Sequence, residues 1–230
     1  MSERLAWRLC LVVGLVLVGL TLLIGSVEGM RACDGSAALD PMIRFEWVRT
    51  VDEVRALFGA EPCRSTLAGA MDGANRIDIF AYIPTFTLFQ LFAAWALHRW
   101  GRHVALTAAA AAIVAAVCDQ AEDQILLAIT ASLPGEQGQI DMLFWLVRVK
   151  FALLAVAGAC LGLLLTRRTG ATRWLGIAMI VGAAVALAGQ AAPQLLTPGI
   201  ALAWTALLIA ALISVVRGSS SSAASSSPPT

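Results

Sequence analysis

Charged residues are scarce in this sequence. Asp, Glu, Lys and Arg together make up 13% of its 230 residues, about half of their share in average soluble proteins. Hydrophobic residues make up 59%, and the mean hydropathy is +0.81. A soluble domain of ordinary composition is therefore excluded, and we expect an integral membrane protein.

The patterns that bind metals or nucleic acids are also lacking. The sequence has two histidines and five cysteines, and no two cysteines form a C-x-x-C pair, so a zinc or redox motif is not expected. The basic residues form no face with interleaved aromatic residues, which argues against a nucleic-acid partner. We predict no metal and no cofactor.

Six apolar runs are candidates for helices that cross roughly 30 Å of hydrocarbon, the fifth being the shortest. They cover about residues 5–27, 78–97, 104–130, 142–166, 174–189 and 200–216. This pattern predicts an all-α fold, a polytopic transmembrane helix bundle with a small helical extracytoplasmic loop. The first run also fits a cleaved signal peptide, but its length and the lack of an A-x-A site favour a retained helix.

Arginines indicate how the bundle is oriented. If six spans alternate, one side collects most of the arginines in the short loops, which is typical of the cytoplasmic side. We therefore expect both termini in the cytoplasm and the loop 28–77 outside. The tail 217–230 consists mainly of Ser, Ala and Pro and is predicted to be a disordered cytoplasmic end.

The outer loop contains one clear helix signal, "RTVDEVRALFGAEP". Thr50 and Glu53 form a capping box before an apolar stripe, and Gly59 ends the pattern. A short amphipathic helix on the outer surface is expected here. Cys33 and Cys63 lie in the same polar loop and form a candidate disulfide in an oxidising compartment, with two free thiols as the alternative.

A group of acids interrupts the third apolar run in "VCDQAEDQIL". Asp119, Glu122 and Asp123 have the spacing i, i+3, i+4 and share one helix face. Facing lipid at mid-bilayer, each would cost roughly 2.5–3.5 kcal/mol. We expect these carboxyls to face other helices or a wet cavity, joined by Asp78 and Tyr82 from the second run.

Lys150 is the only lysine in the chain and lies at a similar depth in the fourth run. Arg148, two residues earlier, cannot point the same way, and we predict Lys150 inside and Arg148 turned outward. Because acids outnumber bases, at least one carboxyl is expected to be neutral at pH 7. The predicted polar cluster comprises Asp78, Tyr82, Asp119, Glu122, Asp123, Arg148 and Lys150.

Two alternatives remain for this cluster. The third helix would end near Val117 if "CDQAEDQ" lay at the surface, although the remaining apolar piece would be short for a crossing. Alternatively, the buried acids only hold helices together, without a ligand or proton traffic.

The segments "FEWVRTVDEVRALFG", "RIDIFAYI" and "DQAED", followed by a lysine in the next span, resemble a family of uncharacterised bacterial polytopic membrane proteins. The resemblance implies a bacterial cytoplasmic (plasma) membrane protein, with Asp123 where asparagine is more usual. It also implies that the positions of the family's motifs are occupied by Phe45, Glu46, Asp78, Asp119, Glu122, Asp123 and Lys150. The resemblance implies no activity.

Three functions fit these observations. The first is a binding or assembly module whose outer polar site receives a lipid headgroup, a small ligand or a partner membrane protein. The second is a proton- or cation-coupled transporter of a small solute. The third is an intramembrane acid/base enzyme using Asp78 and Glu122. The sequence leans against an enzyme and assigns no catalytic residue, because the H-E-x-x-H and G-x-S-x-G motifs are missing.

Overall fold

The structure, a computed structural model, describes residues 1–36 and 39–224, with the backbone alone for 218–224. In this part of the chain every regular element is helical. In chain order these are α1 (Glu3–Gly25), α2 (Pro41–Glu46), α3 (Val51–Phe58), α4 (Cys63–Ile77), the π-helical η1 (Asp78–Tyr82), α5 (Ile83–Leu97), the 3₁₀ turn η2 (His98–Trp100), α6 (Arg102–Ala131), α7 (Gln137–Thr166), α8 (Ala171–Ala188), the 3₁₀ turn η3 (Pro193–Leu195) and α9 (Leu196–Ala224). The predicted all-α fold is confirmed.

Six helical segments are long and apolar enough to cross a membrane. They are Glu3–Gly25, Cys63–Trp100, Arg102–Ala131, Gln137–Thr166, Ala171–Ala188 and Pro193–Arg217. The chain is thus a multi-pass helical membrane protein. The second segment is longer than the predicted 78–97, because α4, η1 and α5 follow one another without a break.

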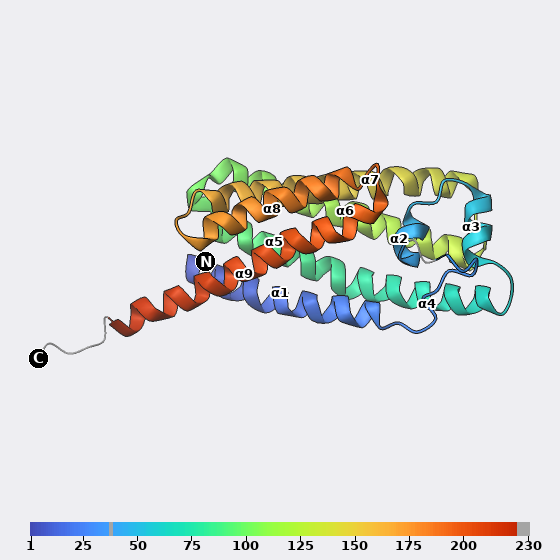
Figure 1. Ribbon diagram of the computed structural model, residues 1–230, viewed down its shortest axis with the longest axis horizontal. Coiled ribbons are helices and arrows are strands. Elements are labelled where there is room, and N and C mark those ends of the chain that lie inside the picture. Colours follow the sequence, from blue (N-terminus) through green and yellow to red (C-terminus); the bar gives the residue numbers. More distant parts are fainter. Residues whose placement is uncertain (37–38, 225–230) are drawn as a thin grey trace, which may run out of the picture.

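The spans form one elongated bundle (Figure 1). The start of α1 and the end of α9 lie at one end of it, here called the terminal end, while α2 and α3 lie at the other, the loop end. At the loop end α4, α6 and α7 extend beyond α1 and α8. The helices α7 and α8 pack closely where Gly162 faces Gly176, since a Cβ on Gly176 would lie 2.6 Å from the Gly162 carbonyl oxygen.

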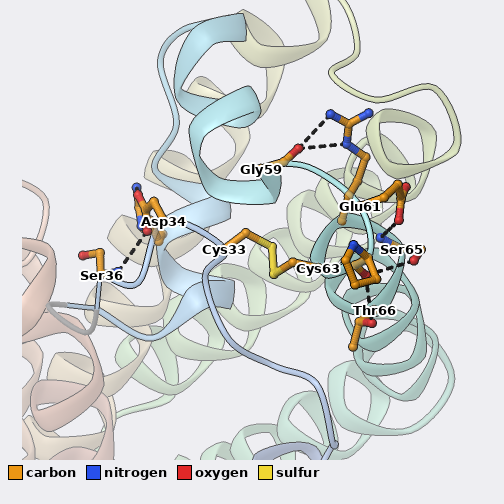
Figure 2. The surroundings of a disulfide bond; sticks show 11 residues. Cys33, Asp34, Ser36, Gly59, Glu61, Cys63, Ser65 and Thr66 are labelled. Carbon is orange, nitrogen blue, oxygen red and sulfur yellow. Dashed lines mark hydrogen bonds and ion pairs between the residues drawn. A yellow bond between two sulfur atoms is a disulfide. The ribbon is translucent and has the colours of Figure 1, made fainter.

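The helices α2 and α3 are fastened to the loop end. Cys33 and Cys63 form a disulfide that joins the segment after α1 to the start of α4 (Figure 2). Next to it, the Arg64 guanidinium donates to the Gly59 carbonyl, which follows α3, at 2.7 and 3.0 Å. The Thr50 hydroxyl caps α3 by accepting from the Glu53 amide at 3.2 Å, as the capping-box pattern predicts.

Two features differ from the sequence-based expectations. The helix α9 continues through Ala224, so the predicted disordered tail does not begin at 217. The physical reason is that alanine and serine prolong a helix that is already formed, and the first proline of the tail is Pro228. Residues 225–230 of the predicted tail lie outside the described residues. The short helix α2 was not predicted.

The acids of the third run lie inside a continuous helix. The helix α6 runs unbroken from Arg102 to Ala131, so the alternative in which it ends near Val117 is wrong. Asp119 lies about 26 Å from the terminal-end start of α6, and Lys150 about 24 Å from the terminal-end limit of α7. For a hydrocarbon layer roughly 30 Å thick that begins at these terminal-end limits, both would lie close to its loop-side border.

Candidate functional site

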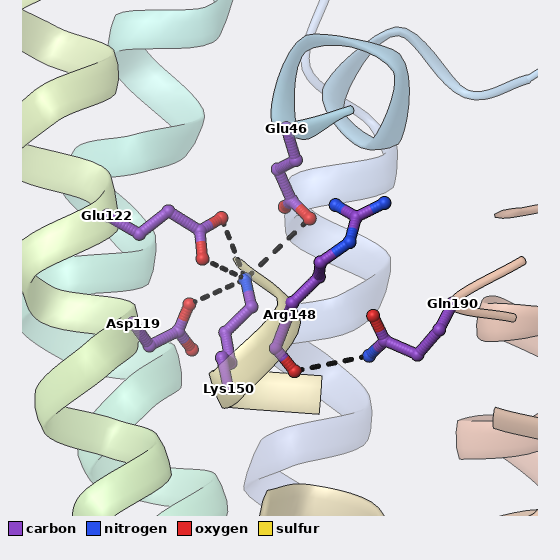
Figure 3. A network of polar contacts seen from close by, with 6 residues as sticks. All are labelled: Glu46, Asp119, Glu122, Arg148, Lys150 and Gln190. Carbon is purple, nitrogen blue, oxygen red and sulfur yellow. Dashed lines mark hydrogen bonds and ion pairs between the residues drawn. The ribbon is translucent and has the colours of Figure 1, made fainter. Parts of the chain in front are cut away.

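The amine of Lys150 is the centre of a buried charge cluster formed by three helices. Its Nζ lies 2.8 Å from both carboxylate oxygens of Glu122, 2.9 Å from Asp119 Oδ1 and 3.6 Å from Glu46 Oε2. Figure 3 shows the amine between α6, which carries Asp119 and Glu122, and α2, which carries Glu46. Exposed fractions are 4% for Lys150 and 0% for Glu122, so water does not screen these contacts.

Glu46 covers the cluster from the loop side. It is the last residue of α2 and is 9% exposed, although it belongs to a loop outside the membrane spans. Burial raises the pKa of the Glu46 carboxyl above its ordinary value, an effect that the nearby Lys150 ammonium opposes. Beyond 3.5 Å the Lys150 contact is an ion pair and not a hydrogen bond. Glu46 is thus the least firmly held of the three carboxyls.

A second group of carboxyls adjoins the first through Asp119. One carboxylate oxygen each of Asp78, Asp119 and Asp123 lies within 4.8 Å of the others. Among the described residues, Asp78 Oδ1 and Asp123 Oδ2 have no hydrogen-bond partner despite being shielded from solvent. An oxygen-only set of donors suits hard cations such as Mg²⁺ or Ca²⁺. With Glu46 and Glu122, five carboxyls thus form two adjoining groups, and three of the five contact the one ammonium.

Arg148 does not join the acids. Its guanidinium lies over the ring of Phe144 at 3.8 Å and 5.7 Å from the ring of Trp47. Only its backbone carbonyl takes part in the network of Figure 3, accepting from Gln190 at 3.2 Å. The structure therefore places Lys150 among the acids and turns the half-buried Arg148 side chain away from them, as two residues spaced i, i+2 on a helix must diverge.

The π-helical turn η1 brings Asp78 and Tyr82 to the site. The Ile83 amide bonds to the Asp78 carbonyl, five residues back. In the same pattern Pro84 would be the donor to Ile79, but proline has no N–H. The Gln120 side chain of α6 supplies the missing bond, donating to the Ile79 carbonyl at 2.8 Å.

An apolar cavity of about 360 Å³ opens beside the cluster. Its polar end contains Glu46, Asp78, Asp119 and Lys150. The remaining walls are mainly apolar or aromatic and come from α1, η1, α5, α7 and α9, including Leu17, Leu22, Tyr82, Phe86, Leu154 and Trp204.

The cavity lies where α1 and α9 separate. Near the middle of α1 the two helices are close, since a Cβ on Gly14 would lie 2.7 Å from Leu208. Toward the loop end their ribbons diverge in Figure 1. Val18 and Leu22 line the cavity and are also 46% and 69% exposed. The cavity therefore reaches the surface of the bundle that faces lipid.

Tyr82 belongs to the wall of the cavity and not to the ion-pair network. Its ring centroid lies 6.2 Å from those of Phe86 and Trp204, and the Phe86 and Trp204 rings stack at 5.7 Å. Its hydroxyl lies 3.5 Å from that of Thr21 on α1. Three aromatic rings thus line the space next to the carboxyls.

Asp78 and Glu122, the acid/base pair considered from the sequence, lie in different groups of the cluster. Both oxygens of Glu122 contact Lys150, while Asp78 groups with Asp119 and Asp123. Sequence reasoning omitted Glu46 from the predicted cluster, and the signal that could have found it is the F-E pair at Phe45–Glu46. Comparison with family models, with curated proteins and with solved structures finds no match for this chain.

Proposed function

We propose that this protein is a binding module of the bacterial cytoplasmic membrane that holds an amphiphilic small molecule or lipid. The ligand lies in the cavity between α1 and α9, with its polar head at the Lys150 cluster and its apolar body along the aromatic wall. We also propose that the chain belongs to the bacterial family that its sequence resembles. Glu46 is one of the motif positions that carry this resemblance, and its place in the cluster supports the proposal.

One observation carries the proposal: the cavity has apolar walls and a single polar end. Ligand sites are typically apolar spaces of roughly 300–1,000 Å³ with a few convergent polar groups. A purely structural ion pair between helices requires no such space. Here Asp119 and Lys150 both hold the helices together and line the cavity.

The proposal includes an orientation. Arginines of the short loops, such as Arg99, Arg102 and Arg167, lie at the terminal end of the spans. Such a bias is typical of the cytoplasmic side. The loop end would then face the extracytoplasmic space, and the cavity would open to the outer leaflet.

Native mass spectrometry of the purified protein tests the proposal. We expect bound amphiphiles that survive purification from membranes. Ala201 lines the cavity, so Ala201→Trp should fill the space and remove these adducts. Leu202, its neighbour, is 41% exposed and outside the lining, so Leu202→Trp is the matched control. The proposal fails if no adduct is seen, or if both variants retain it equally.

Transport is a second candidate, favoured by one observation. Gln90 on α5 is 2% exposed, and its Nε2 has no hydrogen-bond partner among the described residues. It lies about 18 Å beyond Asp78 along the helix axis, toward the terminal end. It therefore provides one polar group on a path from the acid cluster toward the terminal end. Uptake of a radiolabelled small cation into proteoliposomes, lost in Gln90→Leu, would support transport. Uptake no greater than into empty liposomes would reject it.

A further inference from the structure

We infer that the ligand of this cavity carries a cationic head, a protonated or quaternary amine, on an apolar body that enters from the bilayer. The inference rests on the proposed function and specifies the chemistry of its ligand. Two independent features support it: the charge at the polar end of the cavity and the aromatic rings beside it.

The polar end of the cavity has carboxyl oxygens without a hydrogen-bond donor among the described residues. Three carboxyls and one amine line it, and the amine of Lys150 already contacts Asp119 and Glu122. Asp78 Oδ1 and Glu46 Oε2 are shielded from solvent, and neither accepts a hydrogen bond from a described residue. A buried carboxylate oxygen without a donor is costly, and a cationic head that donates to it or approaches it removes this cost.

The aromatic rings suit the same charge. Tyr82, Phe86 and Trp204 line the cavity next to Asp78 and form one contiguous group. Aromatic faces attract cations, and groups of such rings bind quaternary ammonium ligands. An anionic head, such as a free phosphate, would instead meet the three carboxyls of the lining. Among the described residues that line the cavity, Lys150 has the one cationic side chain, and it already contacts Asp119 and Glu122.

Size and access define the rest of the ligand. A cavity of about 360 Å³ lies at the small end of the range for drug-sized ligands, so it fits one alkyl chain or a compact ring system. Val18 and Leu22 border it at the surface of the bundle. A molecule already dissolved in the bilayer can therefore enter between α1 and α9 without crossing water.

Photo-crosslinking tests the charge of the head on the unmodified protein. Two probes share one alkyl chain with a diazirine near its middle, and one ends in trimethylammonium while the other ends in a hydroxyl. In nanodiscs of phosphatidylglycerol, we expect the ammonium probe to label the α1 and α9 peptides about tenfold more than the alcohol does, a difference of about 1.4 kcal/mol.

The outcomes separate the two proposals. Equal labelling of the cavity by both probes would leave the binding module standing and overturn the cationic head. Labelling of the cavity by neither probe would overturn both. In the double variant Asp78→Asn, Asp119→Asn, labelling by the ammonium probe should fall to the level of labelling by the alcohol probe. Asp141→Asn, which removes an exposed acid at the same end of the bundle, should leave the preference unchanged. A preference that survives in the double variant, or that is lost in Asp141→Asn, would also overturn the cationic head.

A further comparison identifies the natural source of the amine. In nanodiscs of phosphatidylethanolamine, whose lipids carry an amine head, competition should reduce labelling if a lipid is the ligand. Labelling that stays the same supports a free amphiphilic amine instead.

Discussion

The side-chain amide of Gln120 on α6 donates to the backbone carbonyl of Ile79 on η1 at 2.8 Å. This hydrogen bond replaces the one that Pro84 cannot make. It joins two helices at the level where Asp78 and Asp119 meet. The π-helical turn and the acid cluster are therefore parts of one arrangement, because the turn sets the direction of the Asp78 side chain.

Gln120→Leu should destabilise the protein by about 1–3 kcal/mol, the cost of a buried polar group left without a partner. In a Pro84→Ala background the backbone has an N–H again, so the same substitution should cost less. Unfolding in detergent of the four members of this double-mutant cycle measures the coupling. Strict additivity of the two substitutions would contradict the relationship between Gln120 and Pro84.

Lys150→Met should destabilise the protein by roughly 3–5 kcal/mol, because it leaves Asp119, Glu122 and Glu46 without their buried cation. Arg148→Met is the control, with an expected loss of about 1 kcal/mol from the contact with Phe144. Unfolding free energies in detergent measure both. Adding Glu122→Gln to Lys150→Met should recover part of the loss. Equal effects of the two single variants would argue against a central role for Lys150.

Several parts of the site follow from sequence and others do not. The spacing of Asp119, Glu122 and Asp123 places them on one helix face, and the divergence of Arg148 and Lys150 follows from helical geometry alone. Membrane spans can also be predicted from the sequence, because bilayer thickness sets the length of the apolar runs. These are local properties of single helices.

The rest depends on tertiary arrangement. Glu46 reaches Lys150 only because the six-residue helix α2 folds back over the bundle, and a helix that short has little periodicity to detect. The cavity depends on the separation of α1 from α9, which no local pattern encodes. The extension of α9 through Ala224 was missed because serine was taken as a sign of disorder although it is tolerated in helices.

The position of α2 should depend on pH through Glu46. Burial raises the pKa of Glu46 above its ordinary 4.5, Asp119 and Asp40 act in the same direction, and Lys150 opposes them. A carboxyl whose folded pKa is raised stabilises the folded arrangement fully below its unfolded pKa, and this contribution is lost as pH rises through the folded pKa. The docking of α2 should therefore weaken as pH rises.

Hydrogen exchange of the α2 amides measures this, after correction for the intrinsic pH dependence of exchange. Protection of α2 should fall as pH rises above the ordinary Glu46 pKa of 4.5, while Glu46→Gln, which is always neutral, should flatten the profile. The amides of α3 serve as an internal control, since the Leu57 carbonyl of α3 accepts from the Cys33 amide at 2.9 Å. A profile that is unchanged by Glu46→Gln would reject the assignment to this carboxyl.

The disulfide between Cys33 and Cys63 gives the orientation of the protein a direct test. The bond forms where the compartment is oxidising, so in cells it requires the loop end to lie outside the cytoplasm. In intact bacteria these two thiols should resist maleimide labelling until a reductant is added. Closing a loop with a sequence separation of 30 should stabilise the fold by about 3–4 kcal/mol, so Cys33→Ser should lower the unfolding free energy by that amount. Cys160→Ser, which removes a free cysteine, is the matched control and should have little effect. If a membrane-permeant maleimide labels Cys33 and Cys63 without reductant while a membrane-impermeant maleimide labels neither, the loop end faces the cytoplasm and the cavity opens to the inner leaflet instead.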